Sequence, residues 1–151
     1  MNFDLTEDQR LLKKMVAKFS DEVVAPAAPA MDRLNKFDRA LWDQLSELGV
    51  MGMMVDPKYG GSGLDTISCC LVEEEIARGS GALALSFVAH SALTTFKISK
   101  DGSDAQKAKF LPDLCSGKKI GALAMTEPQS GSDVFAMMTF AERKKGHYVL
   151  N

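Results

Sequence analysis

At the point where its pattern changes, the chain reads Ile120-Gly121-Ala122-Leu123-Ala124-Met125-Thr126-Glu127-Pro128-Gln129-Ser130-Gly131-Ser132-Asp133. The apolar start predicts a strand over 120–125, and the polar end, with its proline, glycine, hydroxyls and carboxylates, predicts a turn. A strand that opens into such a turn can present backbone N–H groups and hydroxyls to a polar ring or an anion. A plain turn in a β-domain gives the same pattern, so the residues alone leave both interpretations open.

Helical periodicity dominates the sequence before this stretch. Thr6 and Gln9 form a capping box, and we expect the helix that follows to end near Pro26, since Pro26 and Pro29 cannot continue it. Asp38 can cap a second helix that Gly49 stops. Further helices are expected over 65–78, 80–98 and 103–110, with an irregular loop at 51–64 and with Pro112 and Gly117 closing the helical region.

After the polar turn the pattern is typical of a β-hairpin. Met137 to Arg143 and His147 to Leu150 are predicted as its strands, and Lys144-Lys145-Gly146 as the turn between them. The chain is therefore expected to contain about five helices followed by the opening strands of a β-domain.

Composition excludes several classes of protein. Hydrophobic residues make up 46% of the chain, which suits a globular core, and the net charge of −2 argues against a nucleic-acid binder. The cysteines Cys69, Cys70 and Cys115 have no metal-type spacing, and we expect them to be reduced, small, buried apolar side chains.

Neither a targeting segment nor a membrane span is expected. The acidic sequence from Met1 to Asp8 lacks the apolar region of a secretion signal and the basic character of a transit peptide. The uncharged run from Gly79 to Phe96 approaches the length of about 18 residues that can span a bilayer. Its histidine, serines and threonines favour a central helix buried among other helices.

Other candidate sites are weak. The run Glu73-Glu74-Glu75 cannot converge on one metal ion, because successive helical residues point in different directions, and we expect it to form a mostly solvated face. The cluster Gly60-Gly61-Ser62-Gly63 is interpreted as a conformational loop rather than a phosphate loop. His90 is expected to be a hydrogen-bonded core or pocket-wall residue, and Ser132-Asp133 forms no catalytic triad.

The stretch from Ala124 to Ala136 resembles the first signature of the acyl-CoA dehydrogenase family. Further segments similar to this family follow in order and spacing over essentially the whole chain, at 5–9, 45–49, 57–63, 73–78, 106–112 and 147–151. Within the family, Ala89-His90-Ser91 and the segment 120–125 are most similar to members that act on isovaleryl-CoA.

The resemblance implies a mainly α fold. An N-terminal α-helical bundle domain would span residues 1–118, and residues 119–151 would begin a β-barrel-like middle domain, with the family's C-terminal helical domain absent from this chain. It also implies FAD-dependent α,β-desaturation of a short or branched acyl-CoA, an electron-transfer flavoprotein that reoxidises the flavin, and a homotetramer for the whole enzyme. The compartment would be the bacterial cytoplasm or the mitochondrial matrix.

The resemblance also assigns site residues. Contacts to FAD are implied for Leu123, Ala124, Met125, Thr126, Glu127, Pro128, Gln129, Ser130, Gly131 and Ser132. Ser132 would also meet the acyl-CoA, and Ala89 would shape the acyl pocket. No metal ligand is expected, and the catalytic glutamate would lie beyond Asn151. The 151-residue chain alone is therefore expected to be inactive and to bind FAD weakly or not at all. A non-catalytic helical module that binds an acyl chain or a partner remains the alternative.

Overall fold

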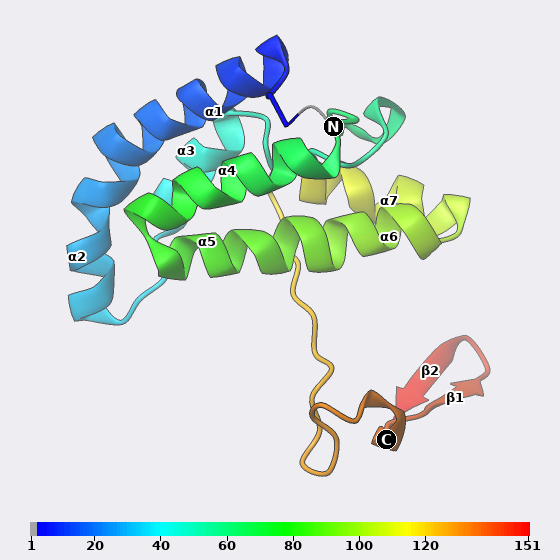
Figure 1. Ribbon diagram of the computed structural model, residues 1–151. Coiled ribbons are helices and arrows are strands. Elements are labelled where there is room, and N and C mark those ends of the chain that lie inside the picture. The colour runs from blue at the N-terminus through cyan, green and yellow to red at the C-terminus, as the bar shows by residue number, and fades with distance from the viewer. Residues whose placement is uncertain (1–2) are drawn as a thin grey trace.

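The computed structural model describes residues 3–151, which form a helical body followed by an extended C-terminal part (Figure 1). Met1 and Asn2, which belong to the predicted helical domain, lie outside the described residues. Helices and π-turns join into continuous helical stretches at 7–34, 39–47, 66–79, 81–101 and 104–115. The predicted mainly α fold with two strands near its C-terminal end is confirmed.

The first helical stretch is longer than the sequence predicts. The capping box is confirmed, because Thr6 Oγ1 accepts a hydrogen bond from Gln9 N and the Gln9 side chain accepts one from Thr6 N. Helix α1 (Glu7–Phe19) passes through a π-turn (Ser20–Val24) into α2 (Ala25–Leu34), and the predicted end near Pro26 is wrong. Pro26 follows the π-turn directly, in the first turn of α2, and the helical stretch bends between α1 and α2 (Figure 1).

Helix α3 (Arg39–Glu47) and the loop after it follow the prediction. Asp38 Oδ1 accepts a hydrogen bond from Leu41 N at 3.1 Å, and Gly49 follows the helix with a φ of +73°. The loop holds one short 3-10 turn, Pro57–Tyr59. A Cβ on Gly61 would lie 2.1 Å from the carbonyl oxygen of Val55, so this glycine allows two backbone segments to approach each other.

Helix α4 (Thr66–Gly79) begins where predicted, after Asp65 as its N-cap, and packs along α1. The expectation of a solvated acidic face is wrong at Glu75, whose side chain is buried between these helices. Its carboxylate pairs with Arg78 at 2.9 Å and with Lys13 at 3.5 Å, because two cations at the helix interface compensate for the loss of water. Within residues 3–151 no group of His, Cys, Asp and Glu side chains could hold a metal ion.

The long apolar helix consists of α5 (Gly81–Val88), a π-turn (Ala89–Thr95) and α6 (Phe96–Asp101). One face is buried through Leu83, Phe87 and His90, whereas Leu85 on the other face is 71% exposed. The prediction of a helix buried among others therefore holds for one face only. Among the described residues, this is the one helix whose length and mean hydropathy of 1.2 would suffice for a membrane span, a criterion that core helices of soluble proteins also meet.

Helix α7 (Asp104–Cys115) closes the helical body and crosses Pro112, where the prediction ended it. Leu114 and Cys115, in the turn after the proline, are buried, and their packing favours continuation of the helix across the lost hydrogen bond. Gly117, with a φ of +69°, ends the helical region as predicted.

The C-terminal part contains one hairpin, β1 (Ala141–Lys144) and β2 (His147–Leu150), with Gly146 at a φ of +85° in its turn. The first strand is shorter than the predicted 137–143. The strand predicted over 120–125 is wrong: this segment is extended, but within residues 3–151 no strand pairs with it. An extended backbone becomes a strand only when a neighbour completes its hydrogen bonds.

The core lies where α3, α4, α5 and the α1–α2 stretch meet, around the fully buried Trp42, Leu45 and Phe87. Trp42 Nε1 donates a hydrogen bond to the Gly117 carbonyl at 3.2 Å, and Arg39 donates to the same carbonyl at 3.0 Å. These bonds tie α3 to the place where the chain leaves the helical body, and so they fix the start of the segment that carries the predicted site.

Candidate flavin and acyl-CoA site

The segment that carries the predicted site leaves the helical body at His90. This histidine is fully buried, and its ring lies perpendicular to that of Trp42, with 5.1 Å between the ring centroids. Its Nδ1 accepts a hydrogen bond from Gly121 N at 2.9 Å, and its Nε2 lies 3.1 Å from the Leu114 carbonyl. The expectation of a hydrogen-bonded core histidine is confirmed, and the structure adds its contact with the site segment.

Burial governs the charge of His90. Removal of the ring from water lowers its pKa, and the hydrogen bond to the Leu114 carbonyl opposes this effect only in part. Both ring nitrogens are engaged, so the side chain has no free nitrogen with which to act as a general base in this chain. Its role here is structural.

Beyond Gly121 the backbone carries unpaired donors. The segment from Ala122 to Thr126 makes no backbone hydrogen bond in the described chain, and its side chains are exposed. Figure 1 shows this segment running away from the helical body as an extended, irregular stretch of backbone. Exposed N–H groups in a row can be satisfied by water, by a neighbouring strand or by a bound polar ring.

The next residues fold back in a tight turn. Glu127 N donates to the Ser130 carbonyl at 2.9 Å, and Ser130 N donates to the Glu127 carbonyl at 3.1 Å. Pro128 and Gln129 form the tip of this turn. Ser130 is buried, and its hydroxyl donates to the Asp133 carbonyl at 2.8 Å. Ser130 therefore holds the turn together, and its own hydroxyl is already engaged as a donor.

Glu127 is a structural residue in this chain. Its carboxylate accepts hydrogen bonds from Met138 N at 2.8 Å and Thr139 N at 3.0 Å, and the Gln129 side chain donates to it as well. The Thr139 side chain, followed by the two backbone N–H groups, lowers the pKa of Glu127 by hydrogen bonding to its ionised form. A carboxylate that is held ionised by donors is a poor general acid and a weak base, so the geometry favours an anchor for the chain after the turn.

Two polar groups of the predicted site remain free. The hydroxyls of Thr126 and Ser132 are exposed and make no hydrogen bond within residues 3–151. Gly131, between the two serines, has open space where a side chain would begin. The Asp133 carboxylate accepts a hydrogen bond from Phe135 N at 3.1 Å. The turn therefore presents two unused hydroxyls on one short segment.

Ala89 lies at the start of the π-turn in the long helix and is half-buried. The same π-turn contacts the site segment through Thr94, because a Cβ on Gly121 would lie 2.5 Å from Thr94 Cγ2. The structure thus brings the beginning of the segment to the helix that carries Ala89. It does not bring Ala89 and Ser132 into hydrogen-bond contact, and the turn lies farther out along the extended segment (Figure 1).

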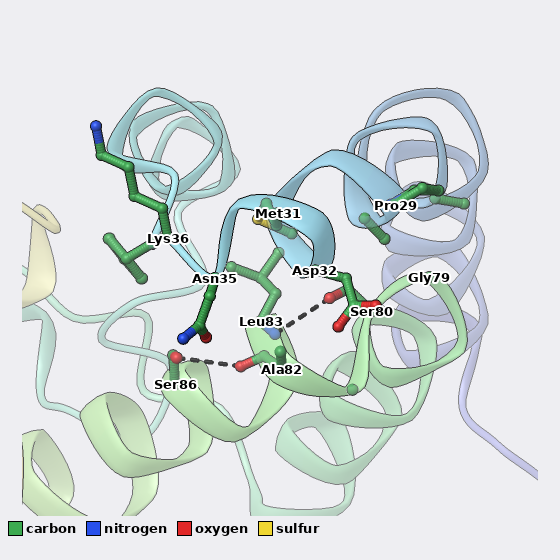
Figure 2. A pocket seen from close by; sticks show the side chains of 14 residues that line it. Pro29, Met31, Asp32, Asn35, Lys36, Gly79, Ser80, Ala82, Leu83 and Ser86 are labelled. Carbon is green, nitrogen blue, oxygen red and sulfur yellow. Dashed lines mark hydrogen bonds between the residues drawn. The ribbon is translucent and has the colours of Figure 1, made fainter.

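A cavity of about 770 Å³ lies elsewhere, between α2 and the start of α5. Figure 2 shows side chains of α2, such as Met31 and Asp32, facing Ser80 and Leu83 across it. None of the residues predicted from the sequence to bind FAD or substrate lines this cavity. Sequence patterns did not indicate it, because its walls come from segments that are distant along the chain.

The cysteines play no part in the site. Burial raises the pKa of Cys69 to about 12 and that of Cys115 to about 11, so neither forms a reactive thiolate near neutral pH. All three are free thiols, as predicted, but Cys70 is exposed, which corrects the expectation that each is buried. Cys70 lies on the outer side of α4, and the helical period places it there.

Comparison with known proteins identifies the family. The sequence pattern of the acyl-CoA dehydrogenase N-terminal domain matches residues 6–118. Isovaleryl-CoA dehydrogenase of Pongo abelii, a mitochondrial protein, is 51% identical over 149 residues, which cover 97% of this chain and 35% of the relative. The chain therefore spans about a third of the length of that relative.

Solved structures agree with this match. Butyryl-CoA dehydrogenase of Megasphaera elsdenii superposes with a TM-score of 0.92 and 36% identity, over 100% of this chain and 40% of the other. The FAD complex of PigA superposes with a TM-score of 0.92 and 30% identity, over 100% of this chain and 40% of the other. From sequence and fold together, the chain belongs to the acyl-CoA dehydrogenase family and contains its N-terminal domain.

Proposed function

We propose that this chain provides the helical domain and the first part of the flavin site of an FAD-dependent acyl-CoA dehydrogenase. The helical domain would span residues 1–118, and residues 119–151 would begin the middle β-domain. The reaction is the α,β-desaturation of a short or branched acyl-CoA, of which isovaleryl-CoA is the leading candidate. The match of the family pattern to residues 6–118, in a chain 51% identical to an isovaleryl-CoA dehydrogenase, carries this proposal.

The segment from Leu123 to Ser132 has the chemistry that a flavin requires. The free backbone N–H groups at Met125 and Thr126, with the exposed Thr126 hydroxyl, suit the polar edge of an isoalloxazine ring. Ser132 would lie where FAD and acyl-CoA meet. When bound, FAD supplies the acceptor for the hydride that leaves the β-carbon of the substrate.

The substrate would lie against the long helix. Ala89 and its small neighbours leave room for an acyl chain, and the exposed Leu93 offers an apolar contact on the same helix. A short branched chain is the substrate class that best suits the identity with isovaleryl-CoA dehydrogenase.

No carboxylate among residues 3–151 is proposed as the base that removes the α-proton. Glu127 accepts hydrogen bonds from two backbone N–H groups, and Glu75 is paired with Arg78 and Lys13 at a helix interface. As the resemblance to the family implies, we propose that the catalytic glutamate lies outside this chain. An electron-transfer flavoprotein is the proposed electron acceptor, a homotetramer the proposed assembly of the whole enzyme, and the mitochondrial matrix or the bacterial cytoplasm its compartment.

The test uses the enzyme that carries this chain together with the rest of the family's architecture. We expect it to be purified with bound FAD, and we expect anaerobic isovaleryl-CoA to bleach the flavin absorbance more effectively than butyryl-CoA. Absence of flavin, or a flavin that no acyl-CoA bleaches, would refute the proposed function. Stronger bleaching by butyryl-CoA would refute the substrate assignment alone.

A substitution at Thr126 tests whether the turn contacts the flavin. Thr126→Val removes the hydroxyl at nearly constant shape and is expected to weaken FAD binding by about ten-fold, the effect of one lost hydrogen bond. Thr66→Val, at an exposed position at the start of α4, is the matched control and should leave FAD affinity unchanged. Equal affinities of the two variants for FAD, measured by flavin fluorescence, would exclude Thr126 as a flavin contact.

A further inference from the structure

One imidazole joins the helical body to the site segment. Nδ1 of His90 accepts the Gly121 N–H at 2.9 Å, and Nε2 lies 3.1 Å from the Leu114 carbonyl at the end of α7. Gly121 is buried, whereas the residues that follow it are exposed. The hydrogen bond to His90 is therefore the last one that the backbone makes with the helical body before the unpaired segment begins.

The hydrogen bonds define the tautomer of the ring. Because Nδ1 accepts a hydrogen bond from a backbone N–H, it carries no proton, and the proton lies on Nε2, which donates it to the Leu114 carbonyl. A doubly protonated imidazolium has no acceptor nitrogen and could not hold Gly121. Only the neutral ring with its proton on Nε2 satisfies both partners.

The π-turn of the long helix carries His90, Ala89 and Thr94. Such turns occur mostly as single interruptions of α-helices and are frequent at functional sites. Here Thr94 Oγ1 donates to the Ala89 carbonyl at 2.9 Å, five residues back, and the Thr94 methyl packs so closely on Gly121 that a side chain at position 121 would clash. The same turn thus carries the proposed substrate-wall residue and contacts Gly121, which lies two residues before the proposed flavin segment.

We propose that His90 is a positioning residue that fixes the flavin segment in register with the helix that forms the acyl pocket. The inference rests on the proposed function for its purpose, but the contact itself is independent of it. His90 touches neither substrate nor flavin in this role. It acts through Gly121, and loss of the contact would let the segment from Leu123 to Ser132 shift relative to Ala89.

Hydrogen exchange of the backbone amides of this chain tests the contact. His90→Phe keeps an aromatic ring against Trp42, although a slightly larger one, and removes both hydrogen bonds. We expect the Gly121 amide to exchange about ten- to a hundred-fold faster, beyond any change shared by core amides of α4. His90→Asn, which keeps one acceptor and one donor, should restore part of the protection.

Ser91→Ala is the matched control, because the Ser91 hydroxyl is buried beside His90 but donates only to the Phe87 carbonyl of its own helix. We expect its Gly121 exchange to change no more than that of the α4 amides. If His90→Phe and Ser91→Ala affect Gly121 equally after this correction, the inference is overturned.

The wild-type chain provides a measurement that needs no variant. In a long-range ¹H–¹⁵N spectrum of the imidazole, we expect Nδ1 to be of the unprotonated type and Nε2 of the protonated type. The opposite tautomer, or averaged signals of both nitrogens, would overturn the inference even if His90→Phe failed to fold.

Flavin affinity of the holoenzyme separates this inference from the proposed function. We expect His90→Phe to weaken FAD binding by about ten-fold or more and His90→Asn to weaken it less. Faster Gly121 exchange with unchanged FAD affinity would overturn the positioning role. A wild-type enzyme that binds no FAD would refute the proposed function, whereas the tautomer and the Gly121 exchange would still decide whether His90 fixes the segment.

Discussion

Single residues of the same type have different roles in this chain because their partners differ. Glu127 accepts backbone N–H groups and anchors the chain after the turn, whereas Glu75 pairs with cations inside a helix interface. Glu74, one residue away, is largely exposed and pairs with Lys13 at 3.4 Å on the surface. The residue type alone indicates a carboxylate, and its environment decides between an anchor, a buried ion pair and an exposed ion pair.

At the residue scale, we predict a pH dependence of stability that comes from His90. Burial lowers its pKa below the ordinary value of 6.5, so between these two values the unfolded chain binds more protons than the folded one. The free energy of unfolding therefore decreases as the pH falls from about 6.5 through this window. Urea unfolding at about pH 7 and about pH 5.5 measures the decrease, which should be smaller in His90→Asn, because asparagine does not titrate.

Two carboxylates affect the stability in a separate, more acid pH range. Hydrogen bonds from Ser68 lower the pKa of Asp65, and a hydrogen bond from Lys119 lowers that of Asp113, so their contribution is present above the ordinary carboxylate pKa and is lost at more acid pH. An equal loss of stability in the wild type and His90→Asn between about pH 7 and about pH 5.5 would contradict the assignment to His90.

Continuous helices here depend on interactions between elements more than on their own sequence. The α1–α2 stretch crosses a π-turn at which the fully buried Ser20 donates a 2.6 Å hydrogen bond to the Glu75 carbonyl of α4. Pro29 lies inside α2 and Pro112 inside α7. Packing against α4 and the loop at 51–64 compensates for the backbone hydrogen bond that each proline removes. The helices therefore continue past residues that would end them in isolation.

At the element scale, we predict that the α1–α4 interface depends on Glu75. Glu75→Ala leaves Arg78 and Lys13 without their shared partner and should lower the free energy of unfolding by about 1–3 kcal/mol. Glu74→Ala removes the exposed ion pair that the 67% exposed Glu74 makes with Lys13 at 3.4 Å, and as the matched control it should change the free energy of unfolding by no more than about 0.5 kcal/mol. Equal losses in urea denaturation would show that burial of Glu75 does not contribute.

The molecule as a whole consists of a packed helical body and an outer segment that packs little. Residues 122–151 hold a turn and a hairpin with mostly exposed side chains, and Phe135 is 97% exposed. Hydrogen bonds at Gly117 and Gly121 tie this part to the body. In the proposed enzyme, further β-structure and FAD would cover these residues.

At the scale of the whole molecule, we predict that chymotrypsin cleaves the chain in two stages. Cleavage after the exposed Phe135 should come first, while the fully buried Trp42 and Phe87 are protected until the helical body unfolds. Mass spectrometry identifies the cut sites, and circular dichroism should show that the helical product keeps its structure. Simultaneous cleavage at Phe135 and Phe87 would contradict a stable helical body.

Features that act over a turn or two of chain could be predicted from the residues alone. Thr6 and Asp38 cap their helices as predicted, Gly117 stops the last one, and Gly146 forms the hairpin turn. Each signal lies within a few residues of the group it satisfies. The turn after Met125 was also recognised from the sequence, because its proline, glycine and hydroxyls have a pattern of their own.

The contacts between distant segments depend on the three-dimensional fold. His90 and Gly121 are separated by 31 residues, Ser20 and Glu75 by 55, and Trp42 and Gly117 by 75, and no local pattern encodes these pairs. The same holds for the strand predicted over 120–125, since an apolar segment becomes a strand only beside a partner. Burial and pairing depend on the whole fold, and therefore the hydrogen bonds that fix the site segment could be found only from the structure.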